Sequence, residues 1–192
     1  YEIVKKDSLS TFLIMGTIAQ PNIQIVDHEV LPQSERPEEE AQLWFANNAN
    51  TFTMVDIFVT AFGLDIGNLA PTVTLNYGSS SDLIPVISGP DKQIRVKATD
   101  SGRLIFDSGT IELPDKSNEL FAIVDDFGPN KDDHVNVIRT LSVAQTIIVD
   151  ASQSARARIA NFSQLESLSA SLDQVQFDEV NRQSFSDYAD IS

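Results

Sequence analysis

The chain has 192 residues, of which 42% are hydrophobic, and this is enough to bury the core of one large domain or two small ones. Thirteen basic residues face 28 acidic ones, and the net charge of −15 disfavours nucleic acid and anionic membrane surfaces as partners. The absence of cysteine excludes a disulfide framework, a catalytic thiol and a zinc site built on cysteine. No apolar run approaches the roughly 18 residues of a transmembrane helix, so we expect no membrane span.

Residues 1–31 contain two apolar runs, "STFLIMG" and "NIQIV", that predict strands. Because the chain opens directly in the strand-like "YEIV", we expect a mature or trimmed product rather than a complete gene product. Residues 32–40 are acidic and contain Pro32 and Pro37, which is typical of an interdomain linker.

Residues 41–142 alternate between apolar and polar side chains with a period of two, which predicts about eight short strands. Turns rich in Gly, Pro, Asn, Asp and Ser separate these strands, and the regular punctuation favours an antiparallel β-sandwich. The predicted strands are Ala41–Ala46, Thr53–Thr60, Thr72–Tyr77, Leu83–Ile87, Gln93–Thr99, Arg103–Leu113, Glu119–Asp125 and His134–Leu141.

A second linker is predicted at residues 143–154, where the apolar "TIIV" could add a strand or pack between domains. Residues 155–192 resume the alternating pattern, and we expect them to form the front part of a further β-sandwich.

Comparison of the chain with itself reveals an internal repeat. Ala41–Asn48 aligns with Ala155–Phe162 at an offset of 155 − 41 = 114 positions. Leu75–Val86 aligns with Val180–Ile191 at an offset of 180 − 75 = 105 positions. The alignment superposes Asn47 on Asn161, Ser81 on Ser186 and Asp82 on Asp187, so we expect these residues to serve a turn structure shared by both copies.

The beginning of the chain matches the other end of the repeating unit. Lys6–Gly16 aligns with Asp115–Asp125 at an offset of 115 − 6 = 109 positions, and "NIQIVDHEV" takes the place of "HVNVIRTL". We therefore expect tandem β-sandwich domains: the C-terminal part of one in residues 1–31, a complete one in 41–142, and the N-terminal part of another in 155–192. The two partial domains together lack a counterpart of residues 88–109.

A partial sandwich of about 40 residues buries too little apolar surface to fold alone, and its strand edges stay unpaired. Three sources could complete it: further residues of the parent chain, the other end of the same chain, or the complementary end of a neighbouring chain. We favour the neighbouring chain, because strand complementation between non-identical surfaces propagates into a head-to-tail fibre.

The pattern of a strand ending in Ala-Asn, then "VDIF", "NYGSSSD", a Gly-Pro turn and "IRVKATDSG" resembles a family of secreted bacterial tandem repeats that is known only as a domain of unknown function. The family reads "VxNASPDAPxVDVYV…YGxxSDY…PAGxYxVxVTxAG", and this chain lacks the "SPDAP" part. The resemblance implies an immunoglobulin-like β-sandwich, export, and a cell-surface or matrix setting. Matching positions are Ala46, Asn47, Val55, Asp56, Ile57, Phe58, Tyr77, Gly78, Ser81, Asp82, Gly89, Ala160, Asn161, Ser186, Asp187 and Tyr188.

The candidates for site chemistry are few. Asp125, Asp126, Asp132 and Asp133 flank a Gly-Pro-Asn turn and are weak candidates for a Ca²⁺ site, although a solvated turn explains them as well. His28 and His134 fall near the last strand of their copies, without the spacing of a catalytic triad, and we expect edge-strand or turn histidines.

Aromatic residues offer one possible ligand platform. Trp44, Phe45, Phe58, Phe62 and Tyr77 could stack on a sugar, or they could form the core and an interdomain contact. Strand alternation puts Trp44 and Phe45 on opposite faces, so we expect one of them to be partly exposed. The serines of "SSSD" and "SFSD" lack a G-x-S-x-G elbow and a base, so we expect no nucleophile there.

Together these features predict a non-enzymatic, extracellular or cell-surface structural protein without a cofactor. Its expected partners are copies of itself in a head-to-tail fibre or stalk. The alternative is a cell-surface binding module, an adhesin or carbohydrate binder, that uses loops at one end of the sandwich.

Overall fold

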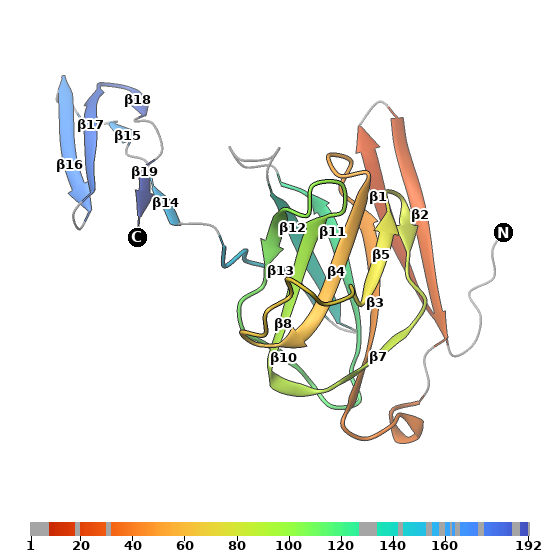
Figure 1. The fold of residues 1–192 in the computed structure, drawn as a ribbon. Coiled ribbons are helices and arrows are strands. Elements are labelled where there is room, and N and C mark those ends of the chain that lie inside the picture. The colour runs from red at the N-terminus through yellow and green to blue at the C-terminus, as the bar shows by residue number, and fades with distance from the viewer. Residues whose placement is uncertain are drawn as a thin grey trace. The chain divides into compact units, whose positions relative to one another are not determined.

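The computed structural model describes residues 8–17, 20–29, 32–126, 134–141, 144–152, 155–157, 160–161, 163, 166–172, 175–185 and 189–191. The chain divides into two compact units, Tyr1–Ala151 and Ser152–Ser192. Apart from the 3-10 turn η1 (Gln33–Glu35), the elements within these described ranges are strands (Figure 1), which confirms the expected all-β class. No helix among these residues is long and apolar enough to cross a membrane.

Two sheets of the first unit face each other and enclose one hydrophobic core. The β4 sheet has the order β10 (Ile111–Leu113), β8 (Gly89–Ala98), β4 (Met54–Ala61) and β5 (Val73–Asn76), and β9 (Leu104–Asp107) also pairs with β8. The β3 sheet has the order β13 (Ala144–Ile148), β12 (Val135–Leu141), β11 (Asn118–Asp125), β3 (Glu40–Asn48) and β6 (Ser79–Ser80), and β7 (Ile84–Ile87) also pairs with β3.

Strand pairs in both sheets are antiparallel, as the regularly spaced turns predicted, except that β3 and β11 run parallel. This parallel pair lies at the centre of the core. The rings of Phe45 on β3 and Phe121 on β11 are stacked with their centroids 5.5 Å apart, and both side chains are fully buried. Such a pair adds a geometric preference to the apolar area that it buries.

Strand β3 is buried on both faces, which alternation alone did not indicate. Leu43 and Phe45 face the core, while Trp44 and Ala46 form a second buried cluster with Leu120 on the outer face of the sheet. Trp44 is only 4% exposed and Phe45 is fully buried, so the expectation that one of the two would be partly exposed is wrong.

A separate hairpin precedes the sandwich and reaches this outer face. It consists of β1 (Ser8–Thr17) and β2 (Gln20–Glu29), paired antiparallel from Thr17↔Gln20 to Ser8↔Glu29. The side-chain amide of Asn48 on β3 donates to Gln24 Oε1 on β2 at 3.4 Å. Asn48 lies on the same face of β3 as Trp44, so this contact places Gln24 of β2 at the outer face of the sheet.

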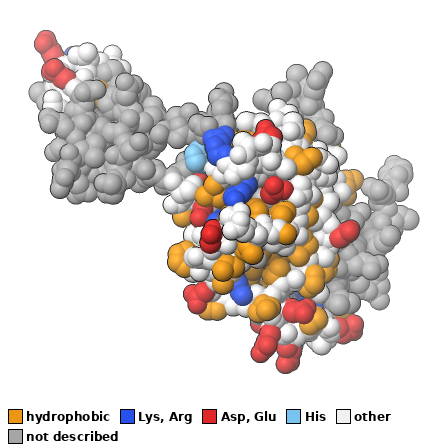
Figure 2. Space-filling model, viewed as in Figure 1, with side chains coloured by type: hydrophobic (Ala, Val, Ile, Leu, Met, Phe, Trp, Pro, Cys, Tyr) orange, Lys and Arg blue, Asp and Glu red, His pale blue; other side chains and the backbone are white. Residues whose placement is uncertain are grey.

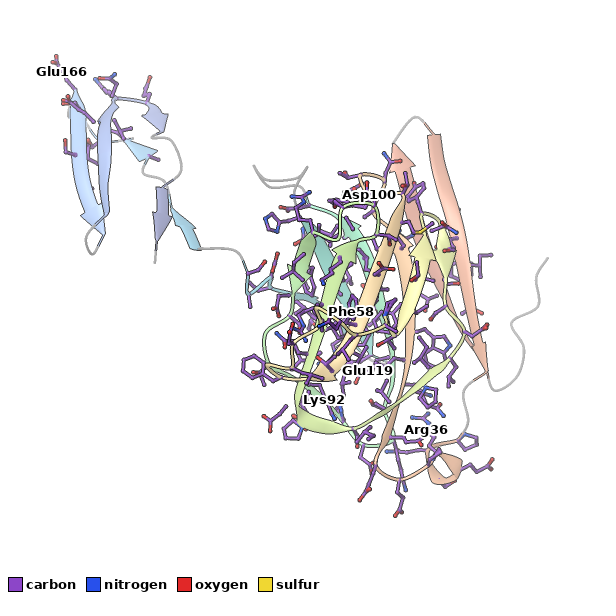
Figure 3. The ribbon with its side chains drawn as sticks, viewed as in Figure 1. Arg36, Phe58, Lys92, Asp100, Glu119 and Glu166 are labelled. Carbon is purple, nitrogen blue, oxygen red and sulfur yellow. The ribbon has the colours of Figure 1, made fainter. Side chains whose placement is uncertain are left out.

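The acidic segment 32–40 is held against the sandwich instead of hanging free. Arg36, beside η1, donates from Nη1 to the carbonyl of Lys116 at 2.6 Å, and the Lys116 amide donates to the carbonyl of Glu40 at 2.7 Å (Figure 3). Lys116 Nζ also lies 3.2 Å from Glu38 Oε1, an exposed carboxylate. These contacts tie the entry of β3 to the turn before β11.

The segment 143–154 contributes a strand, one of the two outcomes expected for "TIIV". Strand β13 pairs antiparallel with β12 through the register Ile138↔Ile147. Beyond β13, the amide of Asp107 donates to Asp150 Oδ1 at 3.0 Å, and the amide of Ala151 donates to the carbonyl of Asp107 at 2.6 Å. The last residues of the first unit are therefore fixed to β9.

A buried ion pair crosses from β11 to β12. The guanidinium of Arg139 donates to Glu119 from Nε at 2.6 Å and from Nη2 at 2.8 Å, and Nη2 also donates to the carbonyl of Glu112 (Figure 3 labels Glu119). The Glu119 side chain has no exposed surface. Such a buried carboxylate is tolerated because the two parallel bonds compensate for its lost hydration.

The second unit contains three short antiparallel strand pairs. β14 (Ala155–Ala157) pairs with β19 (Ala189–Ile191), β15 (Ala160–Asn161) pairs with β18 (Ser184–Phe185), and β16 (Ser167–Leu172) pairs with β17 (Val175–Asn181).

Replacing Phe121 by Ala should lower the free energy of unfolding of the first unit by about 3–5 kcal/mol, because a stacked, fully buried ring leaves a cavity. Urea unfolding followed by the fluorescence of Trp44, the single tryptophan of the chain, measures this change. Phe62→Ala is the matched control: Phe62 is 55% exposed, so its loss should shift stability by less than about 0.5 kcal/mol. Equal effects of the two substitutions would contradict this placement of the core.

Candidate functional site

Asn47, at the end of β3, ties the two sheets of the sandwich together. Its side chain is fully buried, and its amide nitrogen donates to the carbonyls of Phe52 and Leu75, both at 3.3 Å. Its amide oxygen accepts from the backbone amide of Ala49 at 3.2 Å. Leu75 belongs to β5 of the β4 sheet, so this one side chain bridges the β3 sheet, the following loop and the opposite sheet.

Asn161, at the end of β15, repeats two of these bonds in the second unit. It is 1% exposed, and its amide nitrogen donates to the carbonyl of Val180 at 3.0 Å. Its amide oxygen accepts from the backbone amide of Ser163, two residues on, at 3.1 Å. Val180 and Leu75 are aligned in the sequence, and both are buried, at 2% and 5% exposure.

The backbone around the two asparagines also agrees. Gly78 donates its amide to the carbonyl of Asn47 at 2.7 Å, and Gln183 donates its amide to the carbonyl of Asn161 at 2.6 Å. Both donors have left-handed backbones, with φ of +75° at Gly78 and +60° at Gln183. A glutamine in this region costs about 1 kcal/mol relative to glycine, so the surrounding hydrogen bonds are needed to hold it there.

The strand pairings of the second unit follow the sequence alignment, except that β16 is shifted by one residue relative to the 114-residue offset. β14–β19 has the register of β3–β7, β15–β18 has that of β3–β6, and β16–β17 begins with that of β4–β5. Corresponding pairs are Ala41↔Val86 with Ala155↔Ile191, Ala46↔Ser80 with Ala160↔Phe185, and Val55↔Leu75 with Leu168↔Val180.

The hairpin β1–β2 has the register of β11–β12 but the opposite exposure. Phe12 opposes Ile25 as the aligned Phe121 opposes Arg139, and Ile14 opposes Ile23 as Ile123 opposes Val137. In the sandwich, the core-facing members Phe121, Ile123 and Val137 are at most 1% exposed. In the hairpin, Phe12, Ile23 and Ile25 are 60%, 59% and 41% exposed. These three side chains form one open apolar face, which we call the hairpin face.

The repeated Ser-Asp turn relies on its serine. The amide of Ser81 donates to the carbonyl of Phe45 at 2.8 Å, and the hydroxyl of Ser81 accepts from the amide of Phe45 at 3.0 Å. The neighbouring Asp82 is exposed, and its carboxylate makes no hydrogen bond within the described part of the chain. Asp187 and Ser186, the aligned residues of the second unit, lie outside the described residues.

Two of the four aspartates considered for Ca²⁺ are engaged with the protein itself. Asp125 accepts from the backbone amides of Asn50 and Thr51 at 3.1 and 2.9 Å, and so holds the loop after β3. Asp126 accepts from the side-chain amide of Asn136 at 3.0 Å. Asp132 and Asp133 lie outside the described residues, and the described ones contain no group of three potential metal ligands.

His134 has a partner that the sequence did not indicate. Its Nδ1 lies 3.1 Å from Oδ2 of Asp150, whose side chain is 3% exposed and whose Oδ1 accepts from the Asp107 amide. Asp150 lies 16 residues further along the chain, and no local motif links the two. This pair secures the end of the first unit. The nearby hydroxyl of Ser108 does not join the pair and donates to the carbonyl of Gly109. His28 lies on β2.

The five candidate aromatic residues do not assemble into an exposed platform. Trp44, Phe45 and Phe58 are at most 4% exposed, and Lys97 Nζ lies 5.4 Å from the centre of the Phe58 ring (Figure 3). Tyr77 is half-buried, so Phe62 is the only one of these five residues whose side chain is largely exposed. Phe62, Leu64 and Leu69 are instead exposed in the connection between β4 and β5.

Comparison with known proteins adds no assignment. The chain matches no model of a known protein family, and no curated protein is similar to it.

Replacing Asn47 by Ala should reduce the free energy of unfolding by about 2–4 kcal/mol, because two carbonyls and one amide in a closed interior lose their partner. Asp82→Ala is the control on the same strand connection and should change stability by less than about 0.5 kcal/mol. Thermal and urea unfolding of the two variants tests this difference. A stable Asn47→Ala protein would mean that the bridge between the sheets is dispensable.

Proposed function

We propose that residues 40–87 and 155–191 are two copies of one repeat, a half of an immunoglobulin-like sandwich, and that β1–β2 is the end of a further copy. The matching registers and the paired networks of Asn47 and Asn161 support this interpretation. The resemblance to the secreted bacterial repeats of unknown function agrees with it, although it rests on sequence motifs alone.

From this repeat we infer an extracellular, non-enzymatic structural protein: a subunit of a cell-surface fibre or stalk, joined head to tail by strand complementation between incomplete domains. One observation carries the proposal. Among the described strands, β14 and β15 pair only with β19 and β18, whereas their counterpart β3 pairs on its other edge with β11. Strand complementation adds a strand from one copy to a sheet of another, and a contact between unlike surfaces propagates without closing.

The charge of the chain shapes this proposal. With a net charge of −15, copies of the protein repel one another, and burial of apolar side chains must overcome that repulsion. Added salt shortens the Debye length to about 8 Å at physiological ionic strength and weakens the repulsion. Assembly of this protein should therefore be favoured by salt, unlike an interface that depends on ion pairs.

Light scattering coupled to size exclusion, with electron microscopy of the same fractions, tests the proposal. We expect species larger than one chain at micromolar concentration, in greater amount at high than at low ionic strength. A monodisperse monomer at every concentration and salt level would rule out the assembly function.

A cell-surface binding module is the second candidate function, and the exposed loop between β4 and β5 favours it. Phe62, Leu64 and Leu69 are 55%, 49% and 43% exposed there, and Figure 2 shows hydrophobic side chains mixed with acidic ones on the face of the first unit in view. Exposed apolar residues that cluster in one loop are a usual feature of binding surfaces.

Binding to an array of bacterial and host glycans, with Phe62→Ala as the test variant, measures this second function. If the loop binds sugar, the wild-type signal should fall at least about tenfold in the variant, because an aromatic ring supplies the stacking surface. Trp44→Phe is the control, since Trp44 is buried and cannot reach a ligand. No glycan signal for the wild type would exclude the carbohydrate form of this candidate.

A further inference from the structure

We propose that β13 of one copy pairs antiparallel with β13 of a second copy, around a two-fold axis at Thr146. This contact joins the β3 sheets of two copies into one continuous sheet. The inference goes beyond the proposed function, because it depends neither on the repeat nor on residues 155–191.

β13 is an edge strand with an open side. It pairs with β12, and within the described part of the chain it pairs with no other strand. In an antiparallel ladder every second residue directs its N–H and C=O groups away from the partner strand. Residues 144–147 are exposed, with Ile147 at 66%, and Val149 just beyond the strand is 80% exposed. This edge therefore offers both backbone groups and apolar side chains to an added strand.

The other edges of the two sheets are protected, which distinguishes β13 from them. β7, at the far edge of the β3 sheet, contains Pro85, and β6 beside it has two residues. On β5 the carbonyl of Leu75 accepts from the buried side chain of Asn47. β10 has three residues, and on β9 the carbonyl of Asp107 accepts from the amide of Ala151. Proline, short length and covering contacts are common means by which proteins prevent pairing at a sheet edge.

The sequence around β13 has neither a charge nor a proline to oppose pairing. The nine residues Leu141–Val149 contain no charged residue, no proline and no glycine, and they end in three β-branched side chains. Such a segment has a high preference for extended, paired structure.

The charge distribution favours a second copy as the occupant of this edge. Copies with a net charge of −15 repel one another, and that repulsion is weakest where the contacting strands are uncharged. Neither β12 nor β13 contains an acidic residue, and Arg139 on β12 is paired with Glu119. Asp150, two residues after β13, is 3% exposed and lies 3.1 Å from His134 Nδ1. Two β13 strands therefore meet without bringing their own carboxylates together.

Symmetry and backbone geometry define one register for the pair. Residues that oppose each other across an antiparallel ladder must both direct their backbone groups toward the partner strand or both away from it. The two-fold axis therefore passes through a residue and not between two residues. Thr146 is the middle residue of β13, so an axis there pairs all five residues of the strand. Ala144 then opposes Ile148 of the second copy, and Thr146 opposes its own equivalent.

This register also brings apolar side chains together. Ile148 packs against the core, so by alternation Ile147 lies on the outer face of the sheet, next to Ile138 on β12. In the paired state Ile147 of one copy lies diagonally opposite Ile147 of the other, within reach of a side-chain contact. Pairing therefore buries apolar surface that the single chain leaves in water.

The contact is small, so we expect a weak and reversible dimer. β13 supplies five residues from each copy, whereas a standard interface has about 20–30 residues a side. A symmetric contact uses the same surface twice and closes at two copies. The head-to-tail contact proposed above adds one copy after another, so the two contacts differ in the size of the species that they form.

Cysteine cross-linking of the full chain tests this pairing, since the chain has no cysteine of its own. In the proposed register the two Thr146 Cα atoms lie about 4.5–5.5 Å apart, within the separation that a disulfide spans. We expect the Thr146→Cys protein to form a disulfide-linked dimer under mild oxidation, at a rate that rises with protein concentration.

Ala144→Cys is the matched control, because Ala144 is exposed on the same face of the same strand. In the proposed register the two Ala144 Cα atoms are four residues out of line, about 13 Å apart, which a disulfide cannot bridge. This variant should link at most about a tenth as fast as Thr146→Cys. Equal rates would mean that exposed cysteines collide at random and would overturn the register.

A second substitution tests the role of the strand edge itself. A lysine on an edge strand opposes pairing, so Ile147→Lys, added to the Thr146→Cys protein, should slow linkage at least about tenfold. The lysine also makes the net charge one unit less negative, so an effect on general repulsion alone would speed linkage instead. Because Ile147 is 66% exposed, urea unfolding followed at Trp44 should not change. An unaltered or faster rate of linkage would overturn the assignment of β13 as the contact.

The remaining outcomes separate this contact from the proposed assembly. No linkage of the Thr146→Cys protein at any concentration would overturn the β13 pair, and species larger than a dimer in the same samples would leave the head-to-tail fibre standing. A linked dimer without larger species would support the β13 pair and count against the fibre.

Discussion

The amide of Asn47 is the interaction on which the sandwich depends most. A buried primary amide has two donors and an acceptor that must all be satisfied, and here the carbonyls of Phe52 and Leu75 and the amide of Ala49 satisfy them. Apolar side chains can slide over one another, but these bonds fix the end of β3 to β5 in one arrangement. The pairing of the sheets and the direction of the loop after β3 follow from that constraint.

The same constraint appears at Asn161, where the amide contacts the carbonyl of Val180 and the amide of Ser163. The match extends beyond one side chain, since the registers of the strand pairs around it correspond as well. The strands described beside the two asparagines differ. Asn47 has β11 beside its strand, whereas the described strands place nothing on the equivalent edge of β15. Within its described residues, the second unit therefore repeats local bonds of the first.

The hairpin β1–β2 presents the opposite case. It has the register of β11–β12, for which the described strands of the second unit contain no counterpart, and it exposes Phe12 and Ile23 where the complete domain buries Phe121 and Val137. The side of the hairpin opposite Phe12 contacts the sandwich: Gln24 accepts from Asn48, which lies on the face of β3 that carries the buried cluster of Trp44 and Leu120. One side of the hairpin thus contacts its own chain through Gln24, while Phe12 and Ile23 on the other side are exposed.

The sequence predicted the all-β class because alternation fixes which side chains share a face, as in Ile94 and Val96, both at most 1% exposed. Self-alignment also gave the positions that later proved to share registers, including Asn47 with Asn161. Alternation could not predict the parallel pairing of β3 with β11, because side-chain periodicity carries no information about strand direction. It failed for Trp44 because the outer face of β3 is buried as well, and Trp44 packs there with Ala46 and Leu120. It also could not choose between Ser81 and Asp82, or join His134 to Asp150, since those contacts depend on tertiary position.

Residue-resolved hydrogen exchange, measured by NMR over a range of protein concentrations, tests the central proposal that residues 155–191 repeat the fold of 40–87 and are stabilised by assembly with other copies. We expect the amides of Ala49 and Gly78 to be protected at all concentrations. The amides of Ser163 and Gln183, which make the same bonds, should gain protection as concentration rises, together with those of β1. If the amides of Ser163 and Gln183 exchanged at unfolded-chain rates at every concentration while Ala49 and Gly78 remained protected, the account would be contradicted.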